Sequence, residues 1–121
     1  MLDFDSMSRL GQKVYAAASE ASFRHPFPFS QVTGHPLESI QGLLKRTREQ
    51  NELDRDGGDF LRIAMEELFE YCEASLEGDR KRAERELLDV FAVLVKEYER
   101  LERDGATFSW GEHFMRGDSR D

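Results

Sequence analysis

Two acidic stretches decide the fold: Glu66-Glu67-Leu68-Phe69-Glu70 and Glu86-Leu87-Leu88-Asp89, which lie on either side of Gly78. Apolar residues recur at helical spacing before and after this glycine, and glycine commonly ends a helix. The pattern predicts two antiparallel helices joined by a tight turn. In such a hairpin, residues equally far from the turn lie at the same level, so we expect the two acidic stretches to face each other.

The distance from the turn predicts which carboxylates meet. Glu70 and Glu86 each lie eight residues from Gly78. Glu67 and Asp89 each lie eleven residues from it. Two unit charges about 4 Å apart repel by roughly 4 kcal/mol at an effective dielectric near 20, so converging carboxylates require a cation. Because hard oxygen ligands suit Mg²⁺, we predict a magnesium site here, in which Mn²⁺ can substitute.

A solvated helix face is the alternative explanation, because 25 of the 121 residues are acidic and such pairs arise by chance. However, Glu67 falls in the apolar stripe of its helix, where another apolar residue would be expected. That stripe consists of Phe60, Ala64, Tyr71 and Ala74. Asp89 interrupts the most apolar run of the chain, residues 87–95. A lone buried carboxylate is costly, so both positions favour a shared metal site.

The composition indicates one small domain that pairs with itself. A chain of 14.0 kDa with an apolar fraction of 39% has a modest core, so we expect a homodimer or homotetramer. The formal charge of −8 argues against binding to a nucleic-acid polymer or a membrane surface. The sequence contains neither a membrane-spanning run nor the features of a secretory signal. We therefore expect a cytoplasmic protein.

The predicted fold is all-α: a four-helix bundle-like domain over 1–121, without strands and completed by homo-oligomerisation. Helices are expected over residues 6–23, 36–53, 59–78 and 79–105. Asp59 and Asp79 are the expected N-caps of the last two helices, which form the motif-bearing hairpin over 59–104. The tail over 106–121 is polar apart from a few aromatic and apolar residues, and we expect it to be flexible.

The pattern Glu66-Glu67-x-x-Glu70 followed by Glu86-x-x-Asp89 resembles the EExxE…ExxD signature of the all-α nucleoside triphosphate pyrophosphohydrolases. This MazG-like superfamily also includes dimeric dUTPases, dCTP pyrophosphatases and phosphoribosyl-ATP pyrophosphohydrolase. The resemblance covers about residues 59–101, with one departure: Phe69 stands where many members carry a small residue. It implies a single MazG-like domain that hydrolyses a nucleoside triphosphate to the monophosphate and pyrophosphate.

The resemblance also implies roles for individual residues. The expected magnesium ligands are Glu67, Glu70, Glu86 and Asp89. Catalysis is assigned to Glu66 and Glu67, because a carboxylate can accept the proton of the attacking water. Glu66 projects about 100° away from Glu67 around the helix, so it is expected to serve a second metal or water activation.

Basic side chains near the acidic stretches are candidates for binding the substrate's phosphates. Lys96 lies two turns beyond Asp89, and Arg62 lies one turn before Glu66. Both can equally form ion pairs on a helix surface. The basic residues of the second predicted helix, Lys45, Arg46 and Arg48, are a further candidate for phosphate binding, although a solvated helix face explains them better. The nucleobase of the substrate is expected to stack on an aromatic side chain. Loop and tail candidates are His25, Phe27, Phe29 and Trp110, although the Phe residues can equally pack the loop onto the bundle.

A different class of function stays open: a non-catalytic acidic helical module that binds a partner. The intact acidic set is the feature that separates the two, because an interaction role does not need it. Within the enzymatic interpretation, a house-cleaning enzyme for modified nucleotides is an alternative to a dUTPase or a dCTPase. Phosphoribosyl-ATP hydrolysis is disfavoured, since nothing basic obviously accommodates an additional phosphoribosyl group.

Overall fold

The computed structural model describes residues 3–54 and 59–107, and within these ranges the fold is all-α. Its helices are α1 (Phe4–Arg24), α2 (Leu37–Leu53), α3 (Phe60–Leu76) and α4 (Arg80–Thr107). No strand occurs in the described parts of the chain. The all-α fold predicted from the sequence is therefore confirmed. Residues 55–58, between the second and third predicted helices, and the tail from residue 108, including Trp110, lie outside the described residues.

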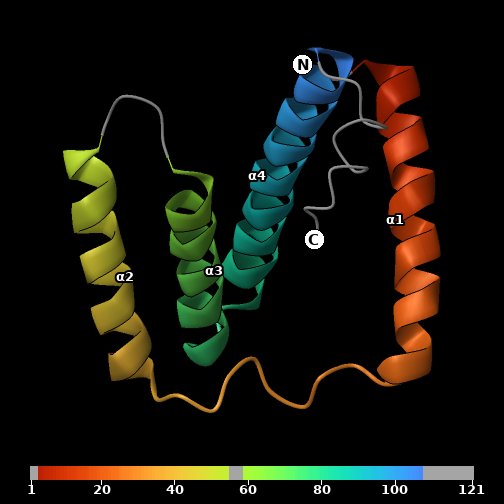
Figure 1. The fold of residues 1–121 in the computed structure, drawn as a ribbon. Helices are drawn as coiled ribbons and strands as arrows, with labels where there is room; N and C mark the ends of the chain where they lie inside the picture. The colour runs from red at the N-terminus through yellow and green to blue at the C-terminus, as the bar shows by residue number, and fades with distance from the viewer. Residues whose placement is uncertain (1–2, 55–58, 108–121) are drawn as a thin grey trace.

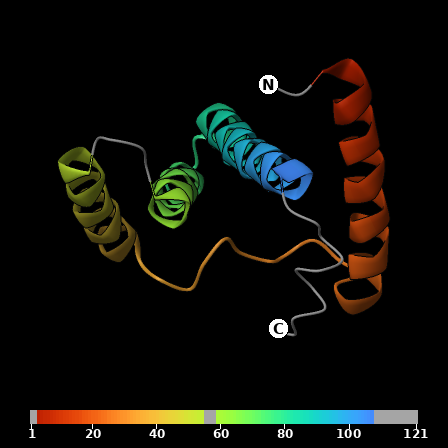
Figure 2. The same cartoon turned by 45° about the horizontal axis from the view of Figure 1, so that its top comes forward.

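Three of the helices form the packed part of the molecule. Figures 1 and 2 show α3 between α2 and α4, with α1 on the far side of α4. The buried apolar residues come from these three helices: Ile40 and Leu44 of α2, Ala64 and Ala74 of α3, and Val90 of α4. Small alanines on α3 allow the neighbouring helices to approach closely. The core therefore fixes α3, the helix that carries the first acidic stretch.

The hairpin forms as its capping residues predict. Asp59 caps α3 by accepting a hydrogen bond from the Leu61 amide at 3.0 Å. Gly78 adopts φ +77°, a conformation that side-chain-bearing residues rarely adopt, and it reverses the chain. Asp79 accepts a hydrogen bond from the Arg82 amide at 3.1 Å at the start of α4. Local sequence thus sets both the turn and the register of the two acidic stretches.

Helix α1 contributes least to the core. It contains no buried residue, and its Val14 is 52% exposed. Its link to α4 is polar: Lys13 donates a hydrogen bond to the Tyr98 hydroxyl at 3.0 Å. Within the described residues, no helix combines the length and apolar character that a membrane span requires.

Candidate metal centre

Acidic side chains from both hairpin helices converge in two groups that share one member. The first group is Glu66, Glu67 and Glu70, all on α3. The second is Glu67 of α3 with Glu86 and Asp89 of α4. Within each group, one oxygen from every carboxylate lies within 4.8 Å of the others. The hairpin therefore brings together all five acids singled out by the sequence, with Glu67 common to both groups. Glu67 is half-buried, but Asp89 is exposed, so the burial that its apolar neighbours predicted is not observed.

The electrostatics of Glu67 reflect this crowding. Burial, followed by the charges of Glu70 and Asp89 and then of the other two acids, raises the pKa of Glu67 to about 7. Repulsion from neighbouring carboxylates disfavours another negative charge at the same place. A divalent cation would relieve that repulsion, and carboxylate oxygens are the donors that Mg²⁺ prefers. The donor set therefore fits the predicted ion.

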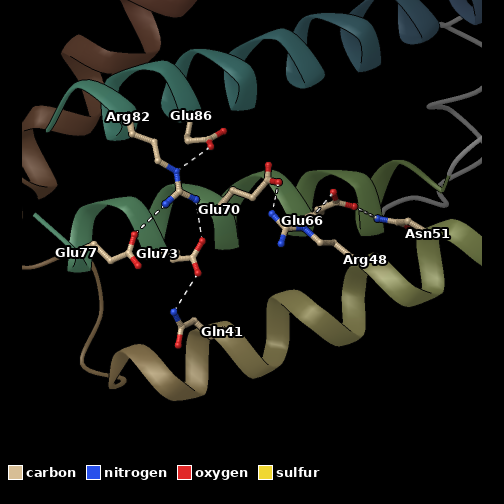
Figure 3. A network of polar contacts seen from close by, with 9 residues as sticks. All are labelled: Gln41, Arg48, Asn51, Glu66, Glu70, Glu73, Glu77, Arg82 and Glu86. Carbon is tan, nitrogen blue, oxygen red and sulfur yellow. Dashed lines mark hydrogen bonds and ion pairs between the residues drawn. The ribbon is translucent and has the colours of Figure 1, made fainter. Parts of the chain in front are cut away.

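Helix α2 supplies polar partners to the first acidic group (Figure 3). The Asn51 amide donates a hydrogen bond to Glu66 Oε1 at 2.8 Å. The Arg48 guanidinium lies 2.7 Å from Glu70 Oε2 and 3.9 Å from Glu66 Oε2. Sequence inspection singled out neither contact, because both depend on how α2 packs against α3 and not on spacing along one helix.

Arg82 joins α3 to α4 near the turn. Its Nη2 lies 2.7 Å from Glu73 Oε1, its Nη1 lies 2.9 Å from Glu77 Oε1, and its Nε reaches Glu86 Oε2 at 3.4 Å (Figure 3). The hydrogen bond from Arg82 holds the pKa of Glu73 below its usual value, and Gln41 adds a second hydrogen bond. Arg82 thus orients Glu86 from outside the two acidic groups. The sequence could have predicted the Arg82–Glu73 ion pair, because Glu73 and Arg82 lie at similar distances from Gly78 and residues equally far from the turn lie at the same level.

The predicted phosphate-binding cations pair with acids outside the two groups. Arg62 forms ion pairs with Asp54 and with Asp59, the latter at 3.4 Å. Lys96 lies 3.3 Å from Glu99, and its side chain is 75% exposed. Their assignment to substrate binding stays a prediction.

One of the predicted aromatic residues lines a pocket beside α3. Phe29 lines a pocket of about 690 Å³ together with Tyr71, one turn beyond Glu67 on α3. The rings of His25 and Phe29 are 5.6 Å apart at a tilt of 55°. Phe27 is 79% exposed. Among the described residues predicted to stack on the base, Phe29 is therefore the one that lines this pocket.

Comparison with known proteins gives no match: no family model, no curated protein and no solved structure matches this chain. What the site does is therefore inferred from its residues, their spacing and their geometry. The decisive geometric feature is the convergence of acids from two helices around Glu67.

Proposed function

We propose that this protein is a Mg²⁺-dependent nucleoside triphosphate pyrophosphohydrolase, which converts an NTP or dNTP to the monophosphate and pyrophosphate. The observation that carries the proposal is the pair of carboxylate groups sharing Glu67 across the hairpin. The spacing of these acids, which resembles the MazG-like signature, supports the same conclusion. A role in clearing unwanted nucleotides from the cytoplasmic pool fits a single small domain of this kind.

The residues that would hold Mg²⁺ are Glu67, Glu70, Glu86 and Asp89. When bound, the ion would neutralise phosphate oxygens and lower the pKa of a coordinated water. Glu66 would accept the proton of the attacking water, and the Asn51 amide holds one of its oxygens at 2.8 Å. Lys96 and Arg62 remain the proposed cations for the outer phosphates, and both lie beyond the acidic stretches at the end of the hairpin far from Gly78.

We further propose that the protein works as a homodimer or homotetramer. Leu87, Phe91, Leu94, Tyr98 and Leu101 recur along α4 at alternating spacings of four and three residues. That period is typical of a helix that packs against another helix along one seam. We call this set the α4 seam; its three leucines and Phe91 are 36–51% exposed within one chain. A second copy would bury them.

Hydrolysis in ¹⁸O-labelled water tests the function directly. A panel of canonical and modified nucleotides is incubated with Mg²⁺ or Mn²⁺, and the products are analysed by mass spectrometry. Attack at the α-phosphorus must place the label in the monophosphate and release intact pyrophosphate, because the water oxygen joins the phosphorus that it attacks. The metal-ligand variant Asp89→Asn should lose activity by orders of magnitude, and the exposed control Glu102→Gln should not.

Each other outcome has a defined meaning. Release of orthophosphate before any other product would indicate a phosphatase that removes the terminal phosphate of the nucleotide. Label found only in pyrophosphate would place the attack at the β-phosphorus. Equal losses in Asp89→Asn and Glu102→Gln would contradict the hairpin site. Failure to hydrolyse any nucleotide would favour the alternative function, a non-catalytic acidic helical interaction module, in which ion pairs such as Arg82–Glu73 serve only to hold the fold.

A further inference from the structure

Arg48 contacts the acidic cluster directly, from a helix outside the hairpin. Its Nη2 lies 2.7 Å from Glu70 Oε2 and its Nε lies 3.9 Å from Glu66 Oε2 (Figure 3). These two acids belong to the same candidate metal group. The Arg48 side chain is nevertheless 48% exposed, so its guanidinium faces both the carboxylates and the solvent from which a substrate arrives.

We propose that Arg48 is a phosphate-binding residue that exchanges Glu70 for the substrate when a divalent cation binds. This inference rests on the proposed function. A cation bound to Glu70 would use the carboxylate that now accepts the guanidinium hydrogen bond, and the two positive charges would repel. The displaced guanidinium is planar and carries several N–H donors, which match two oxygens of a phosphate.

The surroundings distinguish Arg48 from Arg62 and Lys96, the two cations that the sequence predicted to bind phosphate. Arg62 is paired with Asp54 and Asp59, and Lys96 is paired with Glu99, all outside the two acidic groups. Arg48 alone among these three is paired with predicted site acids. It can therefore couple metal binding to phosphate binding, because the same side chain opposes the first and supports the second.

The test is a pair of calorimetric titrations of the full chain and its Arg48→Ala variant. In the first, Mn²⁺ alone should bind roughly tenfold more tightly to the variant, since a competing positive charge has been removed. In the second, inorganic tripolyphosphate with excess Mg²⁺ should bind roughly tenfold more weakly to the variant, since a charged hydrogen-bond donor is lost. A purely structural role would not produce changes of opposite sign.

Two further variants complete the design. Arg46→Ala removes the same charge from an exposed position on α2, about 200° around the helix, and should leave both affinities unchanged. Arg48→Lys keeps the charge but loses the planar donors, so Mn²⁺ should bind as in the wild type and tripolyphosphate should bind with intermediate affinity. Circular dichroism confirms that each variant retains its helices.

The outcomes separate the two proposals. If the wild-type chain does not bind Mn²⁺, the metal centre of the proposed function is wrong and the role of Arg48 falls with it. If the wild type binds Mn²⁺ but Arg48→Ala leaves the Mn²⁺ affinity unchanged or weaker, the proposal that Arg48 moves from Glu70 to the phosphates is wrong, while the metal centre stands. Unchanged tripolyphosphate affinity in Arg48→Ala would equally overturn the exchange.

Discussion

Glu67 is the residue on which the site depends. It belongs to both acidic groups, and burial together with neighbouring carboxylates raises its pKa from 4.5 to about 7. Between these values the folded state holds a proton that the unfolded state has lost, so the stability of the fold without metal falls as the pH rises from 4.5 through 7. Above about pH 7 Glu67 is ionised in both states, and the full loss of stability caused by its buried, repelled charge is present.

Replacing this carboxylate should therefore stabilise the fold in a pH-dependent way. In EDTA, Glu67→Gln should melt roughly 5 °C above the wild type at about pH 8 and close to it at about pH 5, because the penalty develops between these values. Thermal unfolding followed by circular dichroism measures both differences. A stability difference of the same size at both pH values would show that Glu67 is not under electrostatic strain.

Spacing along single helices predicted the convergence of the acids but not their partners. The height of Glu67 and Asp89 above Gly78 was sufficient to place them together. Arg48 and Asn51 belong to α2, which joins the hairpin through apolar packing by Ile40 and Leu44. No local pattern encodes how α2 is rotated about its own axis, so these contacts follow from tertiary packing alone.

At the scale of elements, the sequence predicted the helices closely because their ends carry chemical signals. Asp59 and Gly78 mark the hairpin helix α3, and α2 ends at Leu53 as expected. The other ends differ by one or two residues. Helix α1 spans Phe4–Arg24 where 6–23 was predicted, and α4 extends to Thr107. Helix ends fray gradually, so spacing alone does not fix the last residue.

The Gly78 turn sets the register of the acids, and its backbone conformation can be tested. Gly78→Ala should lower the free energy of unfolding by roughly 1–2 kcal/mol, because an L side chain is strained at φ +77°. No atom lies within 4 Å of the added Cβ, so the loss is not due to a clash. The measurement is a shift of the urea midpoint at unchanged slope.

Gly42→Ala provides the matched control, since Gly42 lies inside α2 and an added Cβ there also meets nothing within 4 Å. It should stabilise the protein by roughly 0.5–1 kcal/mol, because alanine restricts the unfolded chain and favours a helix. If both substitutions shift the urea midpoint in the same direction, the positive φ of Gly78 does not control the hairpin.

At the scale of the whole molecule, one chain leaves much apolar surface uncovered. Helix α1 buries none of its residues, and the α4 seam stays exposed, as at Phe91 (51%) and Leu94 (46%). The sequence predicted the four helices and their apolar faces. It could not predict that α1 would pack so little against the other helices, because an apolar stripe shows that a face is to be covered and not which chain covers it.

The α4 seam gives the last prediction, which concerns assembly. The wild-type chain, 14.0 kDa as a monomer, should elute as a dimer or tetramer in size-exclusion chromatography with light scattering. The double variant Phe91→Lys/Leu94→Lys should elute as a monomer, because charges in an apolar interface remain unpaired and desolvated. Leu53→Lys/Leu61→Lys adds the same charge at residues that are 81% and 62% exposed and lie outside the seam, and it should keep the wild-type mass. A monomeric wild type, or an oligomer that survives the seam variant, would mean that α4 does not form the interface.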